Sequence, residues 1–267
     1  NGTVPDESEL TEAVLNLSVN AFVVEAQAET RASIPSGTPE KETPEEKEIH
    51  NIWVFQYDAA TKELLIKPRY YTITDQAMLQ DLPVYLKAGV PSVVYVVTNT
   101  GYDNWANDGT DASWQKFKQL EQLKKQTLPT AFPLRSIDKV SIPMAGASEE
   151  VEVTTGITVT VPVTRMYAKL KVKVEMRKAE MEPNNVNVRQ IPNICRVETL
   201  AGDGKGEPME PVPFPDETTF SSIAFAASDL EKNEDKEWAV FYVPENLQGE
   251  TQTQGGNKSD AAPSNAL

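Results

Sequence analysis

The chain has 267 residues, with 25 basic and 40 acidic side chains and a formal net charge of −15. This charge repels nucleic-acid phosphates and anionic lipid headgroups, so DNA, RNA and bilayer surfaces are not expected partners. Its polar composition and 19 prolines favour two modest domains over one large core. No run of about 18 apolar residues occurs in the sequence, so no membrane-spanning helix is predicted.

The first predicted element is a strand at residues 13–24, where apolar and polar side chains alternate. Its inward-facing residues are Leu15, Leu17, Val19, Ala21 and Val23. Arg31 and Ala32 follow, and residues 33–48 are rich in proline and glutamate without apolar periodicity, which predicts a solvated loop. A protease that cut at this arginine could remove the strand from a finished domain. The groove left behind would fit a strand of another molecule.

The next elements also belong to the first domain. Residues 49–67 predict a β-hairpin with a polar turn at residues 58–62. Residues 91–99 are rich in β-branched side chains, which predicts a strand in the middle of a sheet. Residues 111–126 predict one amphipathic helix, because large apolar side chains recur every three residues. These side chains are Trp114, Phe117, Leu120 and Leu123.

The domain boundary is predicted between residues 147 and 148, where a segment rich in Ser, Glu, Thr and Gly begins. Beyond it, residues 158–176 predict strand structure, with a clean alternation of apolar and charged side chains from residue 168. Two more short strands are predicted at residues 220–225 and 238–244. The sequence after residue 248 is loop-like, so we expect the second domain to be incomplete.

Side chains that could carry chemistry are scarce. The single cysteine, Cys195, cannot form an intrachain disulfide and is expected to be a buried or edge residue. The single histidine, His50, is expected to be structural or exposed. The sequence contains no nucleophile elbow, Walker loop or dinucleotide-binding glycine motif. We therefore predict no catalytic residue, no cofactor and no metal. An enzyme acting on polysaccharide would rest only on the surplus of carboxylates.

Residues 102–111 carry carboxylates and amides around Trp105. A calcium-binding loop aligned on Gly109 would need an oxygen ligand at Ala106 and a glutamate at Gln115, and both are missing. The main interpretation is a solvated loop that leads into the helix. The alternative is a glycan-binding contact made by Trp105.

Four segments, taken in order, resemble the fimbrillin family, the stalk and tip subunits of the type V pili of Bacteroidales. The two more specific segments are an Arg-x-x-Ala-Lys strand that begins at Arg165 and a Tyr-x-Pro-Glu-Asn-x-x-Gly segment that begins at Tyr242. The four segments are residues 49–58, 142–146, 165–172 and 241–249.

The resemblance implies a mainly β protein with two tandem β-sandwich domains, Greek-key-like and transthyretin-like, and one or two short helices in the first. The first domain would span residues 1–147 and include the removable strand and a cleavage loop at about residues 28–48. The second would span residues 148–267. Family members usually continue with further strands, so either the sequence stops short of them or this subunit departs from the pattern.

The resemblance also implies a route of assembly. The precursor would be exported as a lipoprotein anchored in the outer membrane, and an Arg-specific surface protease would cut between Arg31 and Ala32. Another pilin subunit would then fill the slot by strand exchange, giving an extracellular homopolymer that supports adhesion. The lipid anchor would be present only in the precursor. The alternative is a pilus tip or surface adhesin that binds a glycan or a host protein.

Overall fold

The computed structural model describes residues 10–19, 43–101, 103–110, 112–129, 141–174, 185–197, 219–226, 231–233 and 236–244. These residues are mainly β, as predicted, with few and short helices. The chain divides into two compact units. The first comprises Asn1–Leu123 with Asp138–Arg165, and the second comprises Lys124–Ile137 with Met166–Leu267.

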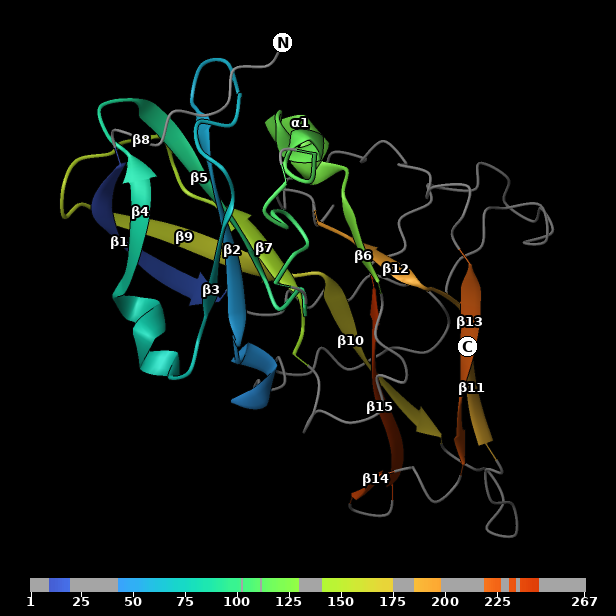
Figure 1. Ribbon diagram of the computed structural model, residues 1–267. Coiled ribbons are helices and arrows are strands. Elements are labelled where there is room, and N and C mark those ends of the chain that lie inside the picture. Colours follow the sequence, from blue (N-terminus) through green and yellow to red (C-terminus); the bar gives the residue numbers. More distant parts are fainter. Residues whose placement is uncertain are drawn as a thin grey trace, which may run out of the picture. The chain divides into compact units, whose positions relative to one another are not determined.

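The first unit is built on one sheet (Figure 1). Its strands are β1 (Leu10–Val19), β2 (Asn51–Asp58), β3 (Arg69–Thr72), β4 (Leu82–Lys87), β5 (Pro91–Thr98), β7 (Met144–Ala147), β8 (Val151–Glu152) and β9 (Thr158–Arg165). The eight strands follow the order β3-β2-β5-β7-β9-β1-β4, and β8 pairs with β5. Strand β1 runs parallel to β9 and antiparallel to β4.

The helices of the described residues are single turns or little more. They are the 3-10 helices η1 (Glu45–Lys47), η2 (Gln76–Gln80) and η3 (Gln115–Phe117), and the α-helix α1 (Leu120–Lys124). At η2 the Asp75 carboxylate accepts the backbone N–H of Ala77 at 2.9 Å, which is a standard N-terminal cap.

Strands β2 and β5 are buried on both faces. Ile52 and Val54 of β2 face the main apolar core of the unit, whereas Trp53 and Phe55 point to the opposite side. Strand β5 lies between β2 and β7, which confirms the prediction of a strand in the middle of a sheet. Burial on both faces explains why these two segments carry so few polar side chains.

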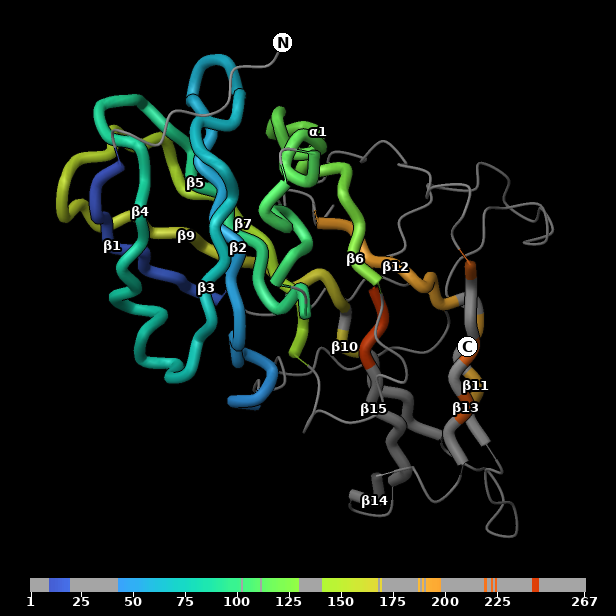
Figure 2. The backbone as a smooth tube through the Cα atoms, in the orientation of Figure 1, coloured from blue at the N-terminus to red at the C-terminus, as the bar shows by residue number. Residues whose placement is uncertain are grey.

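The sheet curls at β9. The first residues of β9 pair with β1, and its last two, Thr164 and Arg165, pair with β7. Where the partner changes, Gly146 of β7 packs against Pro162 so closely that a Cβ atom on Gly146 would collide with the Pro162 carbonyl oxygen. Proline also lacks the N–H that a continuous ladder would require. The sheet therefore passes from β7 to β1 through β9, and the trace of β9 lies between those two strands in Figure 2.

An aromatic cluster covers the second face of β2. The Trp105 ring lies 6.5 Å from the Trp53 ring, 6.2 Å from Phe55 and 5.1 Å from Phe117, with the rings close to edge-to-face. These are favourable geometries for aromatic pairs. The cluster fixes the segment of residues 103–110 against β2.

The prediction of a single helix at residues 111–126 is wrong, because the structure has the short helices η3 and α1 instead. The prediction of which side chains are buried is confirmed. Trp114, Phe117, Leu120 and Leu123 are all buried. The helix is interrupted because the backbone N–H of Leu64 donates to the carbonyl of Lys118 at 2.9 Å, and that of Leu120 donates to the carbonyl of Lys62 at 3.0 Å. Backbone groups that bond to the hairpin cannot also bond within a helix.

Of the predicted hairpin, the turn is confirmed and the return strand is not. The Asp58 carboxylate accepts the N–H groups of Ala60 at 2.8 Å and Thr61 at 2.7 Å. The return strand predicted up to residue 67 makes isolated bridges, and β3 begins at Arg69 instead. Pro68 has no N–H for the ladder, so regular pairing with β2 starts after it.

The boundary between the units lies further along the chain than predicted. The sequence placed it between residues 147 and 148, but β8 and β9 both pair with strands of the first unit. The first unit therefore extends to Arg165. The polar segment around residue 150 is a connection within the first unit.

The second unit contains three small sheets among its described residues, in the orders β10-β15-β14, β11-β13 and β12-β6. The strands predicted beyond residue 164 and at residues 220–225 and 238–244 are confirmed as β10, β13 and β15. The strands of the unit are β6 (Thr127–Pro129), β10 (Tyr167–Val174), β11 (Asn185–Pro192), β12 (Ile194–Arg196), β13 (Phe220–Ala226), β14 (Glu231–Asn233) and β15 (Lys236–Pro244).

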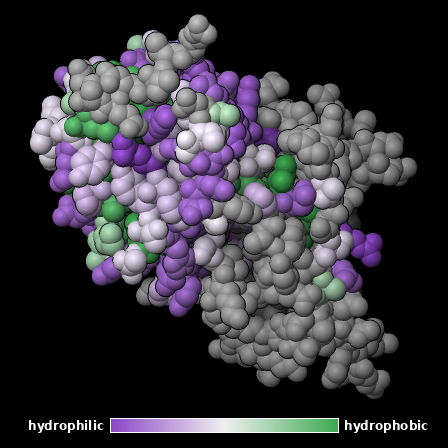
Figure 3. Space-filling view, in the orientation of Figure 1, coloured by the Kyte–Doolittle hydropathy of each residue, from purple (hydrophilic) through white to green (hydrophobic). Residues whose placement is uncertain are grey.

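None of the helices in the described ranges is both long and apolar enough to cross a lipid bilayer. Hydrophilic residues dominate the coloured surface in Figure 3, and hydrophobic residues reach it in small separate patches. The described apolar side chains are thus turned mainly into the cores.

Candidate functional site

Strand β1 is an interior strand of the sheet, even though it comes first in the sequence. It lies between β9 and β4, as Figure 1 shows for the dark blue arrow. Val14 to Val19 pair with β9, and Leu10 to Leu15 pair with β4. The central residues of β1 thus have a strand on each side. Removing β1 would open a slot between two strands instead of trimming an edge.

The backbone of β1 divides its hydrogen bonds between the two sides. Its even-numbered residues face β9: the Val14 N–H donates to the carbonyl of Ile157 at 2.8 Å, and the Glu12 carbonyl accepts the N–H of Gly156 at 2.9 Å. Because successive residues of a strand point to opposite edges, the odd-numbered residues face β4. The slot therefore offers main-chain partners along both walls.

The side chains of β1 alternate as the sequence predicted. Ala13 and Leu15 are 0% exposed and Leu17 is 2% exposed. They belong to the main core of the unit together with Val84 of β4 and Val161 of β9. Burial of this kind stabilises a strand by roughly 1.5–3 kcal/mol for each large side chain. Loss of β1 would expose apolar surface on both neighbouring strands.

Both ends of β1 are also held. The turn that leads into β9 contacts the start of β1, where the hydroxyl groups of Thr11 and Thr155 lie 2.7 Å apart. Gly156 supplies the positive φ of +74° that this turn requires. Near the other end, the Gln80 amide of η2 donates to the carbonyl of Leu17 at 3.4 Å. Helix η2 thus continues the wall beyond the last residue of β1 that pairs with β4.

The remaining predicted site residues are only partly covered by the structure. Val19 is partly buried against the core, in agreement with the prediction. Ala21 and Val23 of the predicted strand lie outside the described residues, as do Arg31 and Ala32 of the predicted processing site. The strand begins at Leu10, three residues earlier than predicted.

Sequence reasoning did not identify the walls of the slot. In both wall strands, buried residues alternate with more exposed ones. The buried residues are Leu82, Val84 and Leu86 of β4 and Val159 and Val161 of β9. The alternation marks each segment as a half-buried strand. It carries no information on which strands become neighbours of β1.

Part of the loop predicted to be solvated is packed against β9. Glu46 of η1 is 1% exposed, and its carbonyl accepts a hydrogen bond from Nε of the buried Arg165 side chain at 3.0 Å. The Glu46 carboxylate accepts the N–H of Thr43 at 3.0 Å. Residues 43–48 are therefore anchored to the last residue of β9. The prediction of solvation failed here because composition does not reveal a single buried contact.

The two isolated reactive side chains lie where the sequence suggested. His50 is exposed, with Nε2 3.6 Å from a carboxylate oxygen of Glu48. Cys195 of the second unit is buried beside Met166, with the two sulfur atoms 4.0 Å apart. Burial raises the pKa of the Cys195 thiol to about 12, so the thiolate is not populated at neutral pH. Neither residue is placed for nucleophilic chemistry.

Trp105 and the residues after it make contacts within the first unit. Trp105 packs in the aromatic cluster described above, which leaves only part of its ring exposed. The Asp108 carboxylate accepts hydrogen bonds from the backbone N–H of Thr110 at 2.9 Å and from its hydroxyl. The hydroxyl bond is the main reason why the pKa of Asp108 lies below its usual range. This arrangement favours the solvated-loop interpretation over a glycan site.

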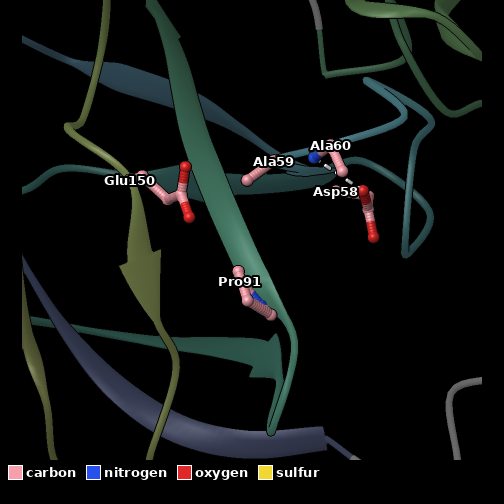
Figure 4. Close-up of a pocket in the computed structure, with 5 residues that line it drawn as sticks. All are labelled: Asp58, Ala59, Ala60, Pro91 and Glu150. Atoms are coloured by element: carbon pink, nitrogen blue, oxygen red, sulfur yellow. Dashed lines mark hydrogen bonds between the residues drawn. The ribbon is translucent and has the colours of Figure 1, made fainter.

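An open hollow of about 230 Å³ lies beside the hairpin turn (Figure 4). It is lined by Asp58, Ala59, Ala60, Pro91 and Glu150. The two carboxyl groups lie apart in the close-up, and that of Asp58 is used by the turn. No group of three potential metal ligands gathers anywhere in the part of the chain that the structure describes.

Comparison with solved structures identifies the fold. The tip fimbrial protein Mfa3 from Porphyromonas gingivalis, with a C-terminal truncation, is similar with a TM-score of 0.51 and 14% identity, over 83% of this chain and 72% of that one. The chain has the fold of a fimbrial protein. The resemblance to fimbrillins is therefore confirmed at the level of the fold. No protein-family model and no curated protein matches the sequence.

Two further fimbrial structures are less similar to this chain. The fimbrial anchor protein Mfa2 from P. gingivalis has a TM-score of 0.48 and 12% identity, over 90% of this chain and 75% of that one. A fimbrial assembly protein from Parabacteroides distasonis has a TM-score of 0.46 and 16% identity, over 89% of this chain and 77% of that one.

Proposed function

We propose that this chain is a structural subunit of a cell-surface pilus that assembles by strand exchange. The precursor is exported as a lipoprotein and anchored in the outer membrane, and each of its two units is completed as a β-sandwich. An Arg-specific protease cuts after Arg31 and releases β1. A segment of another pilin subunit then occupies the slot between β4 and β9, and the resulting extracellular polymer supports adhesion. No catalytic residue is required.

The interior position of β1 carries the proposal. A first strand that pairs on both sides can be replaced by another extended segment, which gains main-chain hydrogen bonds along both walls and three buried side-chain positions. The similarity of the fold to the tip fimbrial protein Mfa3 supports a fimbrial role. An empty slot would expose apolar surface, which favours association with a partner strand.

The test is limited digestion of the full chain with an arginine-specific protease. We expect a new N-terminus at Ala32, followed by a ladder of oligomers in size-exclusion chromatography and on non-denaturing gels.

The matched control is Arg31→Lys, which keeps the charge but removes the cleavage site. This variant should stay intact at residue 31 and remain monomeric under the same conditions. A first cut at another arginine, or digestion at Arg31 without any oligomer, would refute assembly by this route.

A further inference from the structure

Strand β4 is the last strand of the sheet, so its outer edge has no neighbouring strand within the described part of the first unit. The backbone groups on that edge belong to Pro83, Tyr85 and Lys87, because the intervening residues face β1. Proline has no N–H to offer. The N–H of Tyr85 donates to the hydroxyl oxygen of Tyr71 on β3 at 3.3 Å. Side chains from other strands thus take the place of a neighbouring strand.

Gln56 makes the shortest of these hydrogen bonds. Its side chain is 0% exposed and projects from β2 to the end of β4. The Lys87 N–H donates to Gln56 Oε1 at 2.7 Å, and Gln56 Nε2 donates to the Lys87 carbonyl at 2.9 Å. The same Nε2 donates to the Ser92 hydroxyl at 2.9 Å. The amide therefore bonds to Lys87 as the backbone of a neighbouring strand would.

The two walls of the slot differ in what holds them. When β1 is absent, β9 is still paired with β7 through Thr164 and Arg165. Strand β4 would lose its only strand partner in the sheet order among the described residues. A strand without a neighbour is marginally stable in water. The contacts of Gln56 and Tyr71 would then be the remaining hydrogen bonds to the backbone of β4 from β2 and β3.

We propose that Gln56 is a positioning residue that holds β4 in place while the slot is empty. This inference rests on the proposed function, because it requires that β1 leaves the slot after cleavage. With β4 fixed, the slot accepts an extended segment that takes the register of β1, with a small residue at the position of Ala13 and apolar residues at those of Leu15 and Leu17. Because the outer edge of β4 is occupied, the segment enters between β4 and β9 and does not add outside.

The test uses the full chain with the recognition site of a sequence-specific protease inserted after Arg31. The cut is then independent of natural processing, so a failure of cleavage at Arg31 does not affect the result. The cleaved chain is immobilised through its C-terminus and the released fragment is washed away. Binding of a synthetic peptide with the sequence of residues 10–19 is followed by surface plasmon resonance.

We expect Gln56→Met to slow association of the peptide by about tenfold, because β4 loses both hydrogen bonds from Gln56 and must be ordered before the peptide can pair with it. The dissociation rate should stay within about twofold, since β4 is held by the peptide once it is bound. Gln115→Met, at an exposed position, is the matched control and should bind as the wild type does.

A second variant guards against misfolding of Gln56→Met. Tyr71→Phe removes only the hydroxyl that accepts from Tyr85, and we expect association to slow by about threefold. Hydrogen exchange at the amides of Tyr85 and Lys87 should accelerate in both variants when the slot is empty. An unchanged association rate, an effect on dissociation alone, or no peptide binding by the wild type would overturn the proposal.

Discussion

At the scale of single residues, the course of the sheet depends on two positions that lack a group other residues have. Gly146 lacks a side chain where the Pro162 carbonyl approaches, and Pro162 lacks an N–H where β9 changes partners. The sequence predicted the environments of His50 and Cys195 from their isolation. It could not predict those of Glu46 and Gln56, because a buried polar side chain is recognised only by the partner that satisfies it.

Replacement of Gly146 by alanine should destabilise the first unit. The added Cβ would collide with the Pro162 carbonyl oxygen and lie 2.8 Å from its carbonyl carbon, so the backbone must shift. We expect a loss of about 3 kcal/mol in the free energy of unfolding, measured in urea. Gly101→Ala is the comparison, because that site has open space and only a positive φ, and it should lose about 1 kcal/mol. Equal losses would argue against the close contact.

At the scale of elements, the alternation of β1 was predicted and its neighbours were not. A period of two is visible in one segment of sequence, whereas the pairing with β9 joins segments that are far apart in the chain. The helix at residues 111–126 was mispredicted for the same reason. Its apolar spacing is local, but the hydrogen bonds that interrupt it come from the hairpin around Lys62 and Leu64.

The buried face of β1 should dominate its contribution to stability. Leu15→Ala leaves a cavity in the main core, and we expect a loss of about 3 kcal/mol in urea unfolding of the uncut chain. Ser18→Ala, on the exposed face of the same strand, should change the stability by no more than about 0.5 kcal/mol. Similar effects of the two substitutions would contradict the observed orientation of the strand.

Trp105 should act through packing. Trp105→Ala removes ring contacts to Trp53, Phe55 and Phe117, and we expect a loss of about 2 kcal/mol in stability. The exposed neighbour Asn104→Ala should be nearly neutral. A glycan array probed with both variants distinguishes the two interpretations. Loss of glycan binding in Trp105→Ala with unchanged stability would restore the adhesin alternative.

At the scale of the whole molecule, the chain forms two units with separate sheets. The sequence indicated two domains from length and composition, but placed the boundary at a polar segment. The boundary at Arg165 is set by strand pairing, because β9 pairs with β1 and β7 of the first unit. The polarity of a short connection does not affect this pairing. A polar connection between two strands of one sheet has the same composition as a linker.

The two units should unfold separately. Trp53, Trp105 and Trp114 belong to the first unit, whereas Trp238 and Cys195 belong to the second. In a urea titration of a Trp238→Phe variant, whose fluorescence reports the first unit, tryptophan fluorescence and the reactivity of Cys195 towards a thiol reagent should therefore give different midpoints. Before its own transition Cys195 should be unreactive, because it is buried and its pKa is about 12. Coincident curves would indicate a single cooperative unit.

The sequence by itself determined that the chain is mainly β and that its first segment is a half-buried strand. These properties depend on residue types and on periods of two within one segment. Only the tertiary structure decided that β1 lies inside the sheet, between β9 and β4, with Gln56 fixing the outer wall. The physical reason is that strand pairing is made by backbone groups, which are the same in every residue, so the neighbours of a strand are chosen by the packing of the whole unit.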